Sequence, residues 1–155
     1  MGKRREGREA AVQFLYQLDL NGEKGPGDAG IFWGIHSGPG KAAVPPKTRA
    51  FTEQLVAGVM AHRDEIDERI KQCTANYELG RLAAVDRNIL RMAIFEMLHA
   101  PDVAPVIIIN EAIEIAKKFG GDKSGGFVNG VLDRIKKDLG RPDREAASPS
   151  PSTNP

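Results

Sequence analysis

The stretch INEAIEIAKKFGGDKSGGFVNGVLDRI (residues 109–135) decides the fold class. Its apolar residues recur at three- and four-residue spacing, stop at a cluster of glycines and charges, and then restart. This spacing is typical of amphipathic helices and not of strands. The stretch therefore predicts two helices that meet at a glycine-rich corner. We expect Gly120 or Gly121 to end the first helix in a left-handed conformation. Asp122 or Ser124 would then cap the second.

The same helical spacing occurs in segments on the N-terminal side of this stretch. They cover residues 4–20, 46–73 and 76–100. Between the first two, residues 21–46 contain seven glycines and four prolines, which exclude a long regular helix. IFWGIH within that segment is expected to form a short helical turn or a loop that docks on the core. No stretch has the pattern of a sheet, so the sequence predicts an all-α bundle of about six or seven helices.

Composition limits the class of protein further. Of 155 residues, 41% are hydrophobic and 28% are charged, as in a globular domain, which we place at residues 1–140. Residues 141–155 are rich in proline and serine and are expected to be disordered. The net charge is only +1, so any nucleic-acid site must come from the arrangement of charges. One cysteine, no signal peptide and no apolar span predict a cytoplasmic protein without a membrane segment.

Catalytic and cofactor motifs are not convincing in this sequence. GGDKSGG lacks the spacing of a phosphate-binding P-loop and follows a helix where a P-loop follows a strand. Glu96 and His99 have the Glu-x-x-His spacing of di-iron bundles, but those sites need two copies and only one is present. His62 fits a core or boundary position of a helix better than a chemical role. We therefore expect no enzymatic activity, no catalytic residues, no metal and no cofactor.

Two places have residues suited to RNA. Arg4, Arg5 and Arg8 fall within roughly a 100° arc of a helix, with Lys3 near its flexible end. Phe127 stands at the edge of its helix's apolar face beside Lys123, where an aromatic ring can stack on a base and a helix N-terminus attracts phosphate. From pattern alone, a solvated helix start and a packing contact for Phe127 remain alternatives.

Several motifs taken together resemble the bacterial NusB family of transcription antitermination factors. They are the opening stretch and, before it, RREGREAAVQFLYQLDL, FTEQLVAGV and AVDRNILRMAIFEM. The resemblance covers the chain from Arg4 to about Leu139 and departs from the family in residues 21–46 and in the tail. It implies an all-helical fold of two three-helix subdomains without enzymatic activity.

The resemblance also implies partners. Proteins of this family bind the boxA element of ribosomal RNA operon transcripts together with NusE, a ribosomal protein, in the antitermination complex of RNA polymerase. Carried over to this chain, RNA would contact the N-terminal arginines and the second corner helix, and NusE would contact two other positions. The RNA-binding residues are Lys3, Arg4, Arg5, Arg8, Lys123 and Phe127, and the NusE-binding residues are Tyr16 and Asp86.

Four questions stay open at this point. Lys123 and Gly126 stand where related sequences often have acidic or larger polar residues, so their effect on RNA affinity is not fixed. A NusB-like domain also precedes the catalytic domain of an rRNA cytosine methyltransferase family, and we expect no such domain to follow here. A helical adaptor that has lost RNA binding is the other alternative, and the sequence allows a monomer or a homodimer.

Overall fold

The structure is a computed structural model that describes residues 2–22, 25, 27–36, 43–74 and 78–140, apart from the side chains of residues 2 and 3. Within these residues it contains α-helices, one 3-10 turn and no strand, which confirms the all-α prediction. The elements are α1 (Gly2–Leu20), α2 (Ala29–His36), α3 (Pro46–Ala61), α4 (Arg63–Cys73), η1 (Leu79–Arg81), α5 (Ala84–His99), α6 (Pro105–Phe119) and α7 (Ser124–Leu139). The tail predicted to be disordered lies outside the described residues. None of the helices combines the length and apolar character needed to cross a bilayer.

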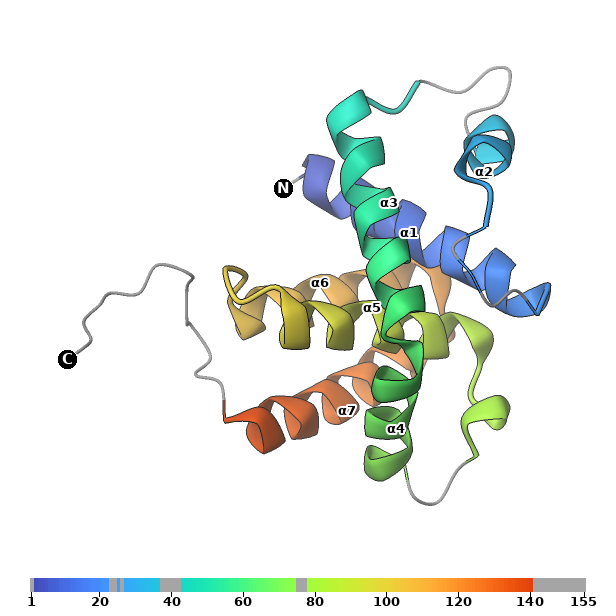
Figure 1. Ribbon diagram of the computed structural model, residues 1–155. Helices are drawn as coiled ribbons and strands as arrows, with labels where there is room; N and C mark the ends of the chain where they lie inside the picture. The colour runs from blue at the N-terminus through green and yellow to red at the C-terminus, as the bar shows by residue number, and fades with distance from the viewer. Residues whose placement is uncertain (1, 23–24, 26, 37–42, 75–77, 141–155) are drawn as a thin grey trace.

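Helix α5 lies in the middle of the molecule (Figure 1). It packs against α1 and α3 on one side and against α4, α6 and α7 on the other. Ile89, Leu90 and Ile94 of α5 are fully buried, as the two adjacent apolar rows of its sequence require. The molecule therefore has the predicted two-part arrangement, with α1–α3 as one part and α5–α7 as the other. Helix α4 packs on α5 and α7.

The long helix predicted for residues 46–73 is in fact two helices that meet at His62. This residue has φ −114° and ψ 21°, outside the helical region. Its amide N–H donates to the carbonyls of Gly58 (3.1 Å) and Val59 (3.2 Å), so the last turn of α3 tightens. The carbonyl of His62 accepts from the Ile66 amide at 3.0 Å and starts α4. Apolar spacing runs on unchanged through the break, so the sequence pattern could not reveal it.

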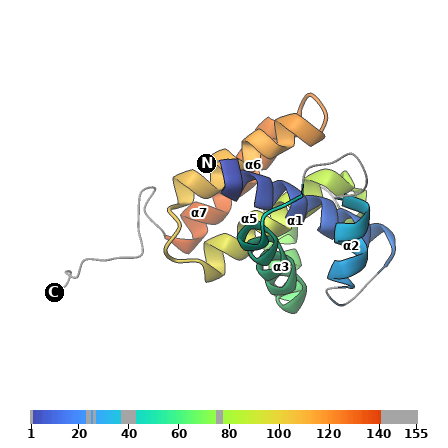
Figure 2. The ribbon, with the colours of Figure 1, turned by 90° about the horizontal axis from the view of Figure 1, so that it is seen from above.

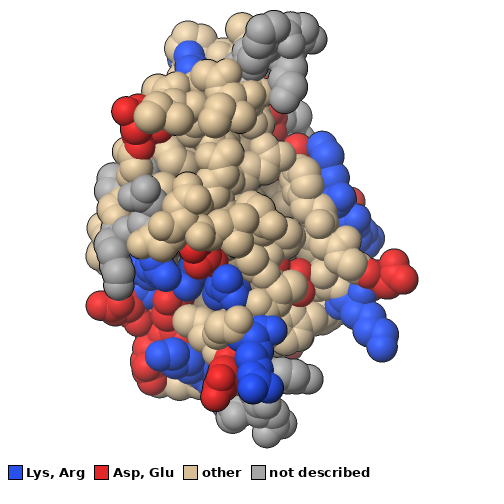
Figure 3. All heavy atoms as spheres, turned by 90° about the vertical axis from the view of Figure 1, so that its right-hand side faces the viewer, with Lys and Arg blue, Asp and Glu red and all other residues tan. Residues whose placement is uncertain are grey.

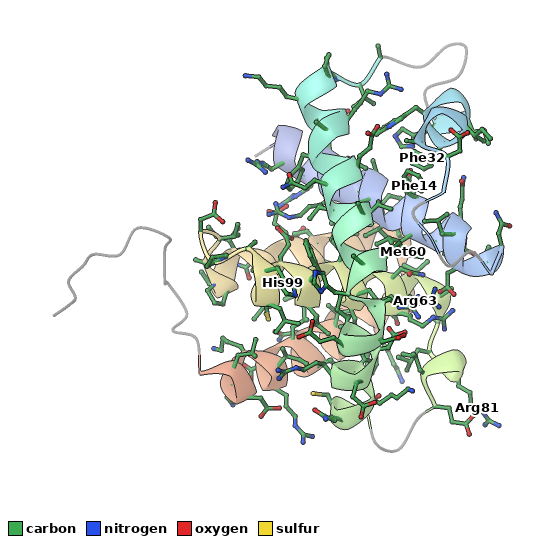
Figure 4. All side chains as sticks on the ribbon, viewed as in Figure 1. Phe14, Phe32, Met60, Arg63, Arg81 and His99 are labelled. Atoms are coloured by element: carbon green, nitrogen blue, oxygen red, sulfur yellow. The ribbon has the colours of Figure 1, made fainter. Side chains whose placement is uncertain are left out.

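The segment IFWGIH forms α2 and docks on the core, as predicted. Phe32 and Trp33 are buried. The rings of Phe14 and Phe32 stack with centroids 4.3 Å apart, joining α1 to α2 (Figure 4). Trp33 Nε1 donates a hydrogen bond to Glu53 Oε2 at 2.7 Å, joining α2 to α3. These contacts fix α2 against α1 and α3, and Phe32 forms part of the wall of a groove described below.

A charged cluster joins the end of α1 to α5 and α4. Asp19 Oδ2 accepts from Arg87 Nε (2.9 Å), Asn88 Nδ2 (2.9 Å) and Arg91 Nη1 (3.2 Å). Arg91 also forms a two-point contact with Asp67 of α4. Burial acts to raise the pKa of Asp19, but the hydrogen bonds from Asn88 and Arg87 outweigh it and lower the pKa overall. The direction of α1 is thus fixed by ion pairs at its C-terminal end.

Candidate nucleic-acid interface

The first turn of α1 contains basic residues and no acidic one. The guanidinium of Arg4 lies over the ring of Phe51 in α3, 4.2 Å from its centroid. Phe51 reaches this position because residue 7 is glycine: a Cβ there would lie 2.7 Å from the Phe51 ring. Thr52 Oγ1 donates to the Gly7 carbonyl at 2.8 Å and holds the two helices at this separation. The start of α1 is therefore a fixed platform for Arg4 and not a frayed end.

Arg5 forms a two-point ion pair with Glu111 of α6. Its Nε donates to Oε1 at 2.9 Å and its Nη2 to Oε2 at 2.8 Å. The Arg5 side chain remains 39% exposed, whereas that of Glu111 is 10% exposed. The hydrogen bond from Arg5 lowers the pKa of Glu111, and in return Glu111 raises the pKa of Arg5. Arg5 thus presents a permanent positive charge at the surface.

Arg8 forms an ion pair of the same geometry in the interior. Its Nε and Nη2 donate to Glu96 of α5 at 2.9 and 2.8 Å, and the two side chains are only 5% and 3% exposed. Burial acts to lower the pKa of Arg8, but the hydrogen bonds and charge of Glu96 raise it overall. The guanidinium also lies 5.4 Å from the Phe51 ring centroid. To contact a phosphate Arg8 would have to leave Glu96, so its predicted RNA contact stays a prediction.

The corner between α6 and α7 differs from the one predicted. Gly120 ends α6 with φ −96° and ψ −174°, so its backbone is extended, and the left-handed prediction is wrong. Gly121 donates its amide N–H to Ser124 Oγ at 3.0 Å. A Cβ on Gly120 would collide with the Ser124 side chain and lie 2.8 Å from the Ala116 carbonyl. Close approach, and not a positive φ, is therefore why glycine is needed at residue 120.

Lys123 and Phe127 are together at the start of α7. Lys123 immediately precedes the helix and is exposed, and the first turn contains no acidic residue. Phe127 is partly buried and packs against the hydrophobic core. Phe127 therefore has a packing contact of the kind that one sequence interpretation describes, and its contact with RNA stays a prediction.

The two predicted RNA-binding clusters lie along α6. Helix α1 begins beside α6 (Figure 2), where Arg5 meets Glu111, and further along Lys118 Nζ lies 2.9 Å from Glu9 Oε1. From Glu111 to Phe119 at the end of α6 is about 12 Å at a helical rise of 1.5 Å per residue. Lys118 is exposed along that distance. The side chain of Lys3, the remaining predicted contact, lies outside the described residues.

Of the two predicted NusE-binding residues, Tyr16 lies at a separate groove and Asp86 is the sequence neighbour of a residue that lines it. Tyr16 lines a groove of about 420 Å³ with Val85, the residue before Asp86. Asp86 is 9% exposed, and its Oδ1 has no hydrogen-bond partner among the described residues. The adjoining side of the molecule, which carries α2 and the end of α1, is uncharged over its middle, with Lys and Arg towards its lower part and right-hand edge (Figure 3). Large exposed apolar side chains of α1 and α2 are Leu20, Ile31 and Ile35.

Sequence reasoning missed the partners of the arginines. Glu111 and Glu96 are 106 and 88 residues away from the arginines that they bind. The spacing of Glu96 and His99 indicates only a metal ligand pair, whereas in the structure Glu96 binds Arg8. In the sequence, the one sign that these glutamates face inward is that each lies one or two residues from an apolar position of its helix. That signal does not identify the partner.

Known proteins share both the sequence and this architecture. The sequence model of the NusB family matches residues 5–137. The transcription antitermination protein NusB of Sorangium cellulosum is 42% identical over 145 residues, covering 94% of this chain and 99% of that protein. The protein of the same name from Bacillus subtilis is 45% identical over 137 residues, covering 88% of this chain and 97% of that protein.

Solved structures agree with the sequence matches. NusB of T. maritima has a TM-score of 0.74 at 34% identity, covering 87% of this chain and 91% of that one. A second structure, described as antitermination factors NusB and NusE in complex with dsRNA, has a TM-score of 0.75 at 28% identity, covering 89% and 98%. The all-helical architecture and the matched motifs thus agree along nearly the whole described chain, and the protein belongs to the NusB family of transcription antitermination factors.

Proposed function

We propose that this protein is a non-catalytic antitermination factor that binds the boxA RNA of ribosomal RNA operon transcripts together with NusE. It would act in the cytoplasm as part of the antitermination complex of RNA polymerase. The observation that carries the proposal is the family match over residues 5–137, together with a structural neighbour described as NusB and NusE in complex with dsRNA. The arrangement of basic and aromatic residues on α1, α6 and α7 supports it.

Phosphate groups would be bound by the start of α1. Lys3, Arg4 and Arg5 follow one another there, at the positive end of the helix dipole. Arg5 is suited to this task because its exposed guanidinium can accept a phosphate as a second or replacement partner for Glu111. Arg8 has a supporting part, since its pair with Glu96 fixes α1 on α5.

Base selectivity would come from the start of α7. The accessible part of Phe127 offers a stacking surface, and Lys123 and the positive end of the helix dipole offer charge beside it. An RNA strand that follows α6 from Arg5 to Phe127 would pass Lys118 on the way. Phosphate contacts would supply most of the affinity and stacking most of the selectivity.

NusE would bind at the groove of Tyr16. Asp86 Oδ1, a buried acceptor without a hydrogen bond among the described residues, supports this assignment, because leaving it unsatisfied is costly and a donor of the partner that reached it would satisfy it. The exposed apolar side chains of α1 and α2 next to the groove supply further contact area.

The test is a titration of the protein against fluorescently labelled boxA RNA and a scrambled RNA, with and without purified NusE. We expect a preference for boxA that increases when NusE is present. Phe127→Leu should reduce the preference more than it reduces binding to the scrambled RNA, and Leu139→Ile, at a partly buried apolar position at the other end of α7, is the control. If the protein binds NusE but shows no preference for boxA, it is an adaptor and the RNA assignment is wrong.

A further inference from the structure

Two histidines and a glutamate from three helical segments meet at a cluster to which the proposed function assigns no role, although His99 also lines a pocket with Arg4 and Arg8. His62 stands at the break between α3 and α4, Glu65 is in the first turn of α4, and His99 is the last residue of α5. Glu65 Oε1 lies 3.7 Å from His62 Nδ1 and 3.4 Å from His99 Nε2. The two imidazole rings stack with centroids 4.0 Å apart. In Figure 4, His99 of α5 lies beside the α3–α4 junction, which Met60 and Arg63 mark.

These separations match those between the ligands of a metal ion. In a tetrahedral zinc site with bonds of about 2.0–2.1 Å, neighbouring ligand atoms are about 3.3–3.4 Å apart. The two Glu65 distances of 3.4 and 3.7 Å are close to this value, and all three ligand atoms lie within 4.8 Å of one another. Because the lone pair of each imidazole nitrogen lies in the plane of its ring, the stacked rings would have to turn out of their nearly parallel arrangement for both to bind one ion. Two histidines and one carboxylate are also an established ligand set for zinc.

The surroundings of the cluster leave room for an ion to enter. His62 and Glu65 line an open groove of about 470 Å³, so a solvent molecule can reach the remaining coordination position. Phe95 packs against both imidazoles, with ring centroids 6.0 Å from His62 and 5.4 Å from His99. This aromatic wall restricts the rings on one side and keeps them close together before any metal binds. Asp64 lines the same groove and adds negative charge near the entrance, whereas Asp67, which also lines it, is paired with Arg91 and Arg63.

We propose that His62, Glu65 and His99 form a binding site for a divalent transition-metal ion such as Zn²⁺. The expectation of no metal, based on the Glu96–His99 spacing, considered the wrong carboxylate: Glu96 binds Arg8, and the carboxylate near His99 comes from another helix. A bound ion would link the α3–α4 break to the end of α5. The site would therefore stabilise the fold, because the ligands come from segments that are apart in the unfolded chain.

The experiment uses the full-length chain after removal of metals with EDTA and desalting. Calorimetric titration with ZnCl2 should show one ion bound per chain. Thermal denaturation should show Tm rising by about 5 to 10 °C at a zinc concentration one hundred times Kd. Titration with CoCl2 should produce a visible absorption spectrum characteristic of a site with histidine and carboxylate ligands and fewer than six ligands.

Ligand variants and matched controls test the assignment. His99→Gln and Glu65→Gln should each weaken zinc binding by at least about tenfold and abolish the rise in Tm, since loss of even an outer partner weakens metal sites 10- to 100-fold. His36→Gln changes a histidine of α2, Glu68→Gln changes an exposed carboxylate of α4, and both should bind zinc as the unchanged protein does. The Tm of each variant without metal shows whether it is folded.

Two results would overturn the proposal. One is the absence of zinc and cobalt binding by the unchanged protein. The other is one-to-one binding that persists in the double variant His62→Gln, His99→Gln, which would place the ion at Cys73 or at the chain terminus. Neither result affects the proposed RNA function, because boxA binding is measured separately and with EDTA present.

Discussion

Arg5 and Arg8 are one helical turn apart on α1, and each binds a glutamate through the same two nitrogens at the same 2.9 and 2.8 Å. They differ in exposure. The Arg5 side chain is 39% exposed, whereas Arg8 and its partner Glu96 are 5% and 3% exposed. For an exposed ion pair, the electrostatic attraction is nearly cancelled by the cost of desolvating both charges and ordering both side chains. In the interior, removing one partner leaves the other charge buried and unpaired, which strongly destabilises the fold.

The comparison shows that hydrogen-bond geometry does not indicate what an arginine does. The same two-point contact can be exchanged for phosphate at the surface and cannot be given up in the interior without leaving a buried charge. We therefore propose that Arg5 binds the ligand and that the pair of Arg8 with Glu96 stabilises the fold. Each of the following variants separates these two assignments.

The largest effect is expected for Glu96→Ala. It leaves the guanidinium of Arg8 buried without a counter-charge, so the free energy of unfolding should fall by about 3–5 kcal/mol. Urea denaturation followed by circular dichroism measures this loss. Glu111→Ala is the matched variant at the exposed pair and should cost no more than about 1 kcal/mol.

A double replacement serves as the control for this prediction. Arg8→Met combined with Glu96→Leu removes both charges and keeps most of the volume, so stability should return to within about 1 kcal/mol of the original or exceed it. A double variant as unstable as Glu96→Ala alone would mean that the glutamate stabilises the protein by packing and not by its charge.

The second effect concerns RNA. Arg5→Ala should weaken binding to boxA by about 5- to 10-fold and reduce the slope of log K against log salt by about 0.7 to 0.9, the contribution of one phosphate contact. Fluorescence anisotropy at several salt concentrations measures both quantities. An unchanged slope would remove Arg5 from the RNA interface, whatever the change in affinity at one salt concentration.

A smaller effect of opposite sign is expected for Glu111→Gln. This variant removes a negative charge beside the proposed phosphate site and frees Arg5 from its pair, so RNA affinity should increase by about 2- to 4-fold. The same anisotropy titration measures it, and Glu114→Gln, one turn away on α6, is the control for a general change in charge. Weaker binding by Glu111→Gln would show that the carboxylate is needed to orient Arg5.

The smallest effect is a dependence of stability on pH. The pKa of Glu111 is lowered from its usual 4.5 in the folded protein, mainly by the hydrogen bond from Arg5. Its contribution to stability is therefore fully present above the unfolded pKa and is lost as pH falls through the folded pKa. Urea denaturation should show that Glu111→Gln is less stable than the original by up to about 1 kcal/mol at pH 7, with a smaller gap at pH 3. An equal gap at both values would contradict the ion-pair account.

Local patterns in the sequence predict most of the helices. Buried apolar residues such as Ile89 and Leu132 repeat at helical spacing. This repeat involves residues three and four positions apart, so it can be read from each segment alone. The break at His62 could not be predicted, because neither proline nor glycine marks it and Ile66 continues the apolar row. The corner at Gly120 was located correctly but with the wrong backbone, because its conformation depends on contact with the Ser124 side chain.

The candidate site was predictable only in part, because it depends on contacts between residues that are far apart along the chain. A helical wheel places Arg5 and Arg8 on one edge of α1, and it cannot tell which of them faces another helix. That difference depends on where α5 and α6 lie, and hence on contacts about a hundred residues away along the chain. The His62–Glu65–His99 cluster likewise exists only because α5 packs beside the α3–α4 break.

The central position of α5 has a consequence for how the molecule opens. Because α5 packs against helices of both parts, unfolding of either part would expose core residues of the other. We expect the backbone amides around Ile89 and Ile94 to exchange with deuterium only through whole-molecule unfolding, whereas those of α2 exchange through local opening. Fragments divided before α5 should then remain unstructured in isolation and recover helix content only when they are mixed.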